Sequence, residues 1–327
     1  MKSLKKLVSR ILNKVIASSI TYQLTRIFDS YFASSSRQIE SVLMLQGRAL
    51  ALHNGDRAPF DNIQEAEFKV FSQFGEDGIL QYLIRESGIE VHEQIFVEFG
   101  VENYSEANTR FLLQSDHWRG LIIDGNPNYI KTVKNGDIYW RNDITAIDAW
   151  IHRDNINELI GDSGFAGKIG LLSIDLDGND FWIWEAIKVI DPIILVIEWN
   201  SVLGSEHAVS IPYNKSFNRM DAHYSCLYWG ASMKAFELLG NRKGYKMLGS
   251  NRVGNNLFFI KEDRIGRMNH VSTSDAYVMS RFRDSRDAKG NLNFLSGRDR
   301  YNEISELPLI EVNNLRTTSL KELDSSK

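Results

Sequence analysis

Residues 171–180 read Leu-Leu-Ser-Ile-Asp-Leu-Asp-Gly-Asn-Asp, an apolar run that leads into three carboxylates. A short apolar run bounded by turn-forming residues is typical of a buried strand in a parallel sheet. Asp175, Asp177 and Asp180 would then lie at the carboxyl end of that strand and in the turn after it. Because ligands of open α/β sheets bind beyond the carboxyl ends of the strands, this stretch predicts a functional site.

A second apolar run, residues 193–197, is followed by Glu198-Trp199-Asn200. If the two runs form neighbouring strands, the carboxyl and amide oxygens at their ends meet around one pocket. Oxygen ligands of this kind suit a hard cation such as Mg²⁺ or Mn²⁺. The alternative is that these side chains cap the following helices and face solvent. The predicted metal ligands are Asp175, Asp177, Glu198 and Asn200.

The composition is that of a soluble globular protein, with 43% hydrophobic and 24% charged residues in a chain of 327. The net charge of −4 argues against general nucleic-acid binding, which needs a basic surface. Cys226 is the one cysteine, which excludes an internal disulfide framework and sites built from several thiolates. No apolar run approaches the roughly 20 residues of a membrane-spanning helix. We therefore expect a cytoplasmic enzyme.

The first 28 residues contain six basic residues and no acidic one. Apolar side chains recur at helical spacing from Leu4 to Ile16, which predicts a basic amphipathic helix over residues 3–28. Such a helix can lie on the inner face of an anionic membrane. The alternative is that its apolar stripe packs on the domain or on a second copy of the chain. Residues 1–66 are expected to form a helical N-terminal extension.

Apolar runs alternate with helix-like segments over residues 67–265, which predicts a parallel sheet with helices on both faces. The segment 201–229 is rich in aromatic and polar residues and predicts an ordered lid. Residues 266–327 are expected to form a helical or irregular tail. The expected strands, the last two of them an antiparallel hairpin, lie at residues 94–100, 120–124, 137–141, 169–174, 193–197, 245–248 and 256–260.

The first strand ends in Glu98-Phe99-Gly100, and the second ends in Asp124. In nucleotide-binding sheets the turn after the first strand approaches the ligand, and the acid of the second strand accepts hydrogen bonds from ribose hydroxyls. The phosphate-binding pattern G-x-G-x-x-G is absent here, and Glu98 and Glu102 would repel a pyrophosphate. These features favour a nucleoside ligand without phosphates, such as S-adenosylmethionine, whose sulfonium is attracted by carboxylates and aromatic rings.

The motifs FSQFGEDG, VEFGVEN, LIIDGNP, SIDLDGND, VIEWNS and GNNLFFI occur in this order. Their order and spacing resemble those of class I methyltransferases, above all the FkbM-type branch and its relatives in surface-polysaccharide gene clusters. The resemblance covers about residues 68–262. It implies a doubly wound, mostly parallel seven-stranded Rossmann-like sheet with an antiparallel last strand. It also implies an S-adenosylmethionine-dependent O-methyltransferase that acts on a sugar or glycan intermediate.

The resemblance also assigns roles by position. The first-strand motif falls on Glu98 and Gly100, the ribose acid on Asp124, and the adenine contact on Asn142-Asp143. The first loop departs from the family pattern, with one glycine where other members have two or three. The expected cofactor contacts are Gln73, Glu98, Gly100, Asn103, Asp124, Asn142 and Asp143.

Methyl transfer to a hydroxyl is an in-line displacement that needs an aligned hydroxyl and an acceptor for its proton. Two routes fit the sequence. A divalent metal could acidify the hydroxyl, or a side chain could act as general base. A histidine in a loop is, however, often only a polar surface residue. The catalytic candidates are Asp175, Asp180, His207 and His223.

Two other interpretations stay open. Asp175-Leu176-Asp177 is also the D-x-D pattern with which sugar-nucleotide glycosyltransferases hold Mn²⁺ and a diphosphate. A methyltransferase-like fold could also serve as a non-catalytic, membrane-attached scaffold, because fold alone does not confer activity. Among partners we expect a small-molecule or glycan acceptor and no nucleic acid. A peripheral membrane contact through residues 1–28 and a homo-oligomer are left open.

Overall fold

The computed structural model describes the backbone of residues 2–325, and the side chains of that range except those of 2–21, 29, 32 and 33. The chain divides into two compact units, Met1–Arg48 and Ala49–Lys327. Helix α1 (Lys2–Arg57) forms the first unit and ends in the second. The apolar stripe from Leu4 to Ile16, on which the membrane interpretation depends, lies outside the residues whose side chains are described. Within the described part of the chain, no helix is both long and apolar enough to cross a membrane.

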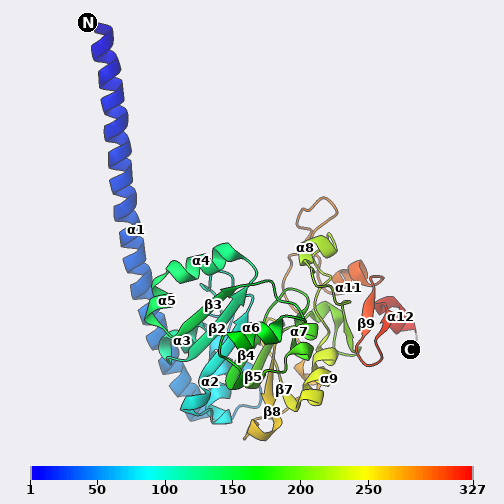
Figure 1. Ribbon diagram of the computed structural model, residues 1–327. Helices are drawn as coiled ribbons and strands as arrows, with labels where there is room; N and C mark the ends of the chain where they lie inside the picture. Colours follow the sequence, from blue (N-terminus) through cyan, green and yellow to red (C-terminus); the bar gives the residue numbers. More distant parts are fainter. Residues whose placement is uncertain (1, 326–327) are drawn as a thin grey trace. The chain divides into compact units, whose positions relative to one another are not determined.

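The second unit is built around a sheet that has seven strands within the described residues, in the order β3-β2-β1-β4-β5-β8-β7 (Figure 1). Strands β1 to β5 run parallel, and β8 is antiparallel to both of its neighbours, β5 and β7. The expected fold class, a doubly wound and mostly parallel seven-stranded sheet with an antiparallel last strand, is confirmed. The strands are β1 (Ile95–Phe99), β2 (Arg119–Asp124), β3 (Ile144–Asp148), β4 (Gly167–Ile174), β5 (Ile190–Glu198), β7 (Tyr245–Ser250) and β8 (Asn256–Lys261).

The third strand was predicted at residues 137–141, and this prediction was wrong. That segment forms helix α5 (Asp137–Arg141), in which the first and last side chains form an ion pair at 2.9 Å. A pair spaced four residues apart stabilises a helical turn. Strand β3 (Ile144–Asp148) follows it, with the alternating burial of an edge strand. The aromatic run inside α5 resembles a strand in composition but lacks that alternation.

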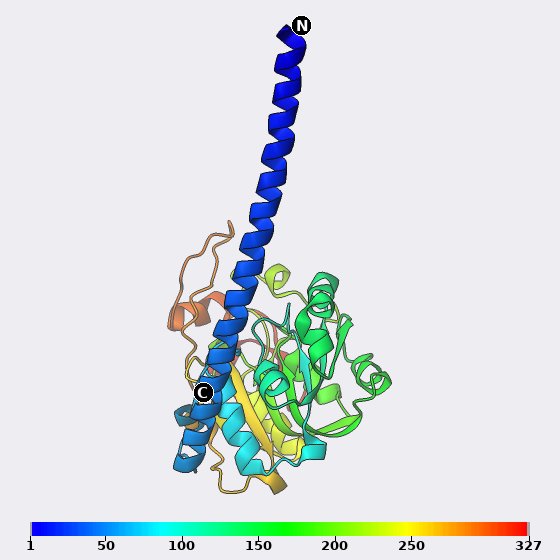
Figure 2. The same cartoon turned by 90° about the vertical axis from the view of Figure 1, so that its left-hand side faces the viewer.

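Helices cover both faces of the sheet (Figures 1 and 2). Side chains of α2, α3 and α4 contribute to one apolar core, and side chains of α6, α7 and α9 contribute to the other. Successive residues of β1 alternate between them, because Phe96 packs in the first core and Val97 in the second. These helices are α2 (Glu76–Ser87), α3 (Arg110–Ser115), α4 (Pro127–Asn135), α6 (Ile156–Asp162), α7 (Asp180–Ala186) and α9 (Met233–Lys243).

The C-terminal segment, expected to be a helical or irregular tail at 266–327, contains short helices and two short strands. Strand β9 (Leu309–Glu311) pairs with β10 (Arg316–Thr318) on one side and with β6 (Val209–Ser210) on the other, and β6 belongs to the segment predicted as a lid. Lid and C-terminus share a third apolar core that includes Leu320. Strands of two or three residues are too short to show the alternation of apolar and polar residues by which a strand is predicted from sequence.

The remaining elements are short helices in the lid, in the C-terminal segment and in the connections. They are α8 (Arg219–Ala222), α10 (Thr273–Ala276), α11 (Arg298–Ile304), α12 (Leu320–Ser325) and the 3₁₀ turns η1 (Ile63–Ala66), η2 (Val91–Glu93), η3 (Ser201–Leu203) and η4 (Glu262–Arg264).

The packing of the C-terminal segment predicts a contrast between two leucines of the same stretch. Leu320 is 1% exposed and Leu315 is 66% exposed. Leu320→Ala should lower the free energy of unfolding by about 2 to 4 kcal/mol, because it opens a cavity in the third core. Leu315→Ala should change it by no more than about 0.5 kcal/mol. Urea denaturation measures both values, and equal effects would mean that the segment does not pack as described.

Candidate active site

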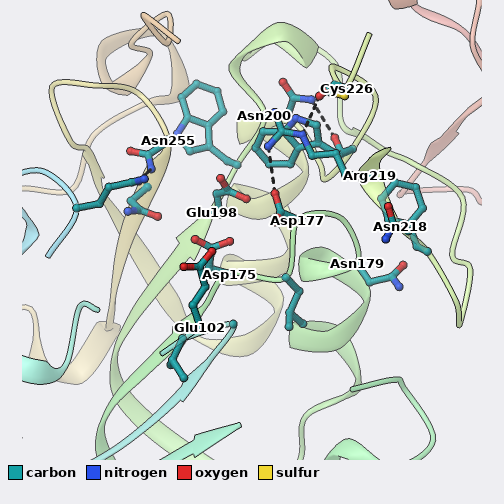
Figure 3. Close-up of a pocket in the computed structure, with 18 of the residues that line it drawn as sticks. Glu102, Asp175, Asp177, Asn179, Glu198, Asn200, Asn218, Arg219, Cys226 and Asn255 are labelled. Atoms are coloured by element: carbon teal, nitrogen blue, oxygen red, sulfur yellow. Dashed lines mark hydrogen bonds and ion pairs between the residues drawn. The ribbon is translucent and has the colours of Figure 1, made fainter. Parts of the chain in front are cut away.

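A pocket of about 790 Å³ opens at the carboxyl ends of β1, β2, β4 and β5 (Figure 3). The turns that follow these strands form its floor. Its wall includes residues from segment 217–229 of the lid and from segment 280–286, here called the cap segment. A cavity of this size suits an organic cofactor together with part of a second ligand. The site therefore lies at the sheet edge that the sequence predicted.

The turn after β1 passes close to the turn after β4. Gly100 has a φ of +71°, and a Cβ atom at this position would lie 1.7 Å from the backbone oxygen of Asp175. Only glycine tolerates both the left-handed conformation and this approach. Gly100 lines the pocket, as predicted for the first-strand motif.

Asp124, at the end of β2, ties two of these turns together. Its Oδ2 accepts the N–H of Glu102 at 2.8 Å, and its Oδ1 accepts the N–H of Asn126 at 2.8 Å. An ionised carboxylate can accept about four hydrogen bonds, so acceptor capacity is left for a ligand. Asp124 also lines the pocket. Its position therefore suits the predicted contact with ribose hydroxyls.

Glu98 is buried at the end of β1 and holds the loop that follows. Its carboxylate accepts the backbone N–H groups of Asn108 at 2.9 Å and Thr109 at 3.2 Å, and also the Thr109 hydroxyl. Burial raises the pKa of Glu98, and these hydrogen bonds oppose the shift. Its carboxylate is thus largely committed to the loop, although the residue still lines the pocket floor.

The side of the pocket next to β3 differs from the prediction. Asn142 and Asp143 precede β3, and neither they nor Asn103 belong to the pocket wall. The reason is the position of the third strand, whose carboxyl end leads into Ala149 and Trp150, and both of these line the pocket. Correct placement of that strand would have identified them.

Trp150 connects the floor of the pocket with the lid. A Cβ atom at Gly125 would lie 2.8 Å from the indole ring, so the ring rests on the turn after β2. The indole N–H donates a hydrogen bond of 2.8 Å to the backbone oxygen of Lys215. Gln73, another predicted contact, also lines the pocket and accepts a hydrogen bond of 3.4 Å from Asn255.

Asp175 and Glu198 form a pair of carboxyl groups in the centre of the site (Figure 3). Burial, and then the charges of neighbouring carboxylates, raise the pKa of each well above its usual value. The side chains lie within hydrogen-bonding reach of each other. Among the described residues, Oε2 of Glu198 has no hydrogen-bond partner. The pair can therefore share a proton and accept a hydrogen bond from a ligand hydroxyl.

The four predicted metal ligands all line the pocket, but two of them are engaged by other groups. Asp177 forms an ion pair with Arg219 at 3.1 Å. The amide of Asn200 donates to the backbone oxygens of Leu227 and Trp229, each at 2.9 Å. Over the part of the chain that the structure describes, no group of three or more His, Cys, Asp or Glu side chains could hold a metal ion. The predicted metal site is therefore not supported, and Asp175 and Glu198 form a carboxyl pair.

Asp180 and the two histidines lie outside the pocket wall. The carboxylate of Asp180 accepts the N–H groups of Leu176 and Gly178 at 2.8 and 3.0 Å, so it shapes the turn after β4. Burial raises the pKa of Asp180 to about 7. The Nδ1 of His223 lies 2.7 Å from a serine hydroxyl, and burial lowers its pKa.

His207 lies under the C-terminal segment, where its Nε2 is 3.9 Å from Asp324. Of the four catalytic candidates, only Asp175 thus lines the pocket.

Arg219, on α8, is a central residue that the sequence did not indicate. It joins Asp177 to Asp284 of the cap segment, with the second ion pair at 2.7 Å. Its Nε donates to the backbone oxygen of Cys226 at 2.7 Å, and its guanidinium lies 4.8 Å from the centre of the Trp229 ring. These partners are far apart in sequence, so no local pattern could have revealed them.

No protein-family model matches the sequence, and no curated protein is similar to it. Solved structures with a similar fold include the N-terminal domain of EvdMO1 with S-adenosylhomocysteine bound, at 10% identity and a TM-score of 0.39, covering 68% of this chain and 97% of that one. An O-methyltransferase from Bacillus cereus in complex with S-adenosylhomocysteine has 15% identity and a TM-score of 0.36, covering 56% and 79%. A putative caffeoyl-CoA O-methyltransferase from Staphylococcus aureus has 15% identity and a TM-score of 0.34, covering 57% and 82%.

The close approach at Gly100 predicts that this position does not tolerate a side chain. Gly100→Ala should lower the free energy of unfolding by about 2 kcal/mol or more, because strain adds to the clash with Asp175. Gly161, in α6, has open space where its Cβ would be, and Gly161→Ala should stabilise the protein by up to about 1 kcal/mol. Chemical denaturation compares the variants, and a harmless Gly100→Ala would refute the described turn.

Proposed function

We propose that this protein is an S-adenosylmethionine-dependent O-methyltransferase. The observation that carries the proposal is the combination of Gly100 and Asp124 at the edge of a methyltransferase-type sheet. The first lets the turn after β1 approach the turn after β4 at the pocket floor, and the second lines the pocket with carboxylate oxygens that can accept hydrogen bonds from ribose hydroxyls. The ring of Trp150 offers an apolar wall for the base beside them.

The carboxyl groups around the pocket support a methyl donor over a phosphorylated cofactor. Glu98, Glu102 and Asp124 line the part of the pocket next to β1 and β2. They would repel a diphosphate, whereas they attract the ammonium and sulfonium groups of S-adenosylmethionine. Figure 3 shows the Glu102 side chain projecting toward the centre of the site, where Asp175 lies.

We further propose a sugar or glycan intermediate of surface-polysaccharide biosynthesis as the acceptor, in keeping with the FkbM-type resemblance of the sequence. The remaining wall combines aromatic and polar side chains, as saccharide recognition requires. They are Asn200, Phe217, Asn218, Trp229, Asn255, Asn256 and Phe282.

The carboxyl pair supplies the chemistry for the acceptor. Glu198 has an oxygen without a hydrogen-bond partner among the described residues, and this oxygen can orient an acceptor hydroxyl. The deprotonated member of the pair would take the hydroxyl proton as the bond from the acceptor oxygen to the methyl carbon forms and the bond from that carbon to sulfur breaks, which releases S-adenosylhomocysteine. We derive no step through a metal, because Asp177 and Asn200 are engaged with Arg219 and the lid backbone.

The glycosyltransferase alternative is less well supported. In a D-x-D site both acids face one cation and a diphosphate, but here Asp177 pairs with Arg219 while Asp175 pairs with Glu198. Because Asp177 is already paired with a cation of the protein, the geometry on which that interpretation depends has no support.

Titration calorimetry with S-adenosylhomocysteine tests the proposal. Asp124→Asn keeps the size of the side chain but loses carboxylate acceptors, so the affinity should fall by about tenfold or more. Asp148→Asn is the matched control, because Asp148 pairs with Asp124 across β2 and β3 at the same sheet edge but is exposed and outside the pocket wall. It should bind like the wild type. Thermal unfolding checks that both variants fold.

Binding by neither the wild type nor the control would overturn the cofactor assignment. Equal binding by all three proteins would overturn the role of Asp124.

A further inference from the structure

The segment 279–297, here called the cap hairpin, rises beside α8 (Figures 1 and 2, in brown), and several of its residues line the pocket. Arg286 and Leu292 form an antiparallel bridge within it. The hairpin is fastened to the lid by the Asp284–Arg219 ion pair and by the N–H of Arg286, which donates to the backbone oxygen of Ser225 at 3.2 Å. These contacts hold the hairpin in a defined position on the domain.

Large apolar side chains are exposed on this projection. Met279 is 50% exposed, Leu292 is 46% and Phe294 is 50%, and Met220 of the adjoining α8 is 57% exposed. Phe294 has a φ of +57°, a conformation that is unfavourable for a bulky residue. The next residue, Leu295, packs against the third core. The backbone thus turns in a way that leaves the aromatic ring outside.

Basic residues surround these apolar side chains. The hairpin contains four basic residues and two acidic ones, in a chain whose net charge is −4. Asp284 pairs with Arg219, whereas Asp287 accepts only backbone N–H groups, of Lys289 and Asn291, and keeps its charge. With four basic and two acidic residues, the hairpin has a net charge of +2. Its basic residues are Arg281, Arg283, Arg286 and Lys289.

We propose that the cap hairpin docks the protein on the surface of an anionic lipid bilayer. Exposed leucine and phenylalanine side chains enter the boundary between headgroups and acyl chains, and flanking arginine and lysine side chains bind acidic headgroups. A dimer in which two copies of the chain meet through their hairpins is less favourable, because two basic hairpins repel each other.

Docking through the hairpin orients the catalytic site. Ser280, Phe282 and Arg286 belong to the hairpin and also line the pocket. The mouth of the pocket would then open at the bilayer surface, where an acceptor carried on a lipid anchor is within reach. The docking inference itself does not depend on methyl transfer, and its test needs no substrate.

An environment-sensitive fluorophore at the hairpin tip tests the proposal on the full chain. The label is placed on Asn291→Cys, since Asn291 is exposed and the native Cys226 is 4% exposed. Vesicles of phosphatidylcholine with about one third phosphatidylglycerol should shift its emission to the blue, and brominated lipids should quench it. The control label is on Val91→Cys, which is 83% exposed and lies in η2, before β1. It should show neither effect.

Two sets of substitutions in the labelled chain separate the contributions. Leu292→Ser with Phe294→Ser should reduce vesicle partitioning of the tip by about tenfold or more, through lost apolar insertion. Arg281→Gln with Lys289→Gln should reduce it by a similar factor, and added salt should mimic this loss.

Three results would overturn the proposal. The first is a tip label unaffected by anionic vesicles even though the chain sediments with them through another segment, such as residues 1–28. The second is an equal response of the label to vesicles without acidic lipid. The third is an emission that shifts with protein concentration in the absence of vesicles, which would indicate a second copy as the partner.

Discussion

The candidate site depends on the contact between the turns after β1 and β4, at Gly100 and Asp175. A backbone oxygen lies where any other residue would carry its Cβ, so the two turns can meet only through glycine. Because these turns meet, the acid that follows β4 lies beside the loop that follows β1. Asp124 then ties this loop to the turn after β2. One steric condition thus brings Gly100, Asp124 and the central carboxyl pair into the same pocket.

The buried acids in and around the pocket differ in how their carboxyl oxygens are satisfied. Asp180 and Glu98 satisfy backbone N–H groups and thereby fix two of the turns. Asp175 and Glu198 have no comparable set of backbone donors, and burial beside other carboxylates raises their pKa values. Close burial of like-charged groups disfavours the folded state, and such sites are often retained for chemistry. This contrast is the reason for assigning proton transfer to the pair.

Much of this arrangement could be predicted from local sequence. Gly100, Asp124, Asp175 and Glu198 each follow an apolar run directly, and the shared edge of parallel strands then places them together. The errors have local causes as well. The segment that forms α5 was predicted as the third strand. The predicted adenine contact was therefore placed on residues that precede β3, instead of on residues that follow it. A ligand set chosen by residue type also could not reveal that Asn200 holds the lid backbone.

The parts that could not be predicted depend on pairing between distant segments. The link from Arg219 to the cap and the three-stranded sheet of lid and C-terminus are of this kind.

The most direct test of the account is hydrogen exchange of the wild-type chain with and without S-adenosylhomocysteine. With S-adenosylhomocysteine bound, we predict slower exchange at residues 98–108, 122–129 and 149–151, which surround the pocket floor. Unchanged exchange in these three segments, or protection confined to another part of the chain, would contradict it.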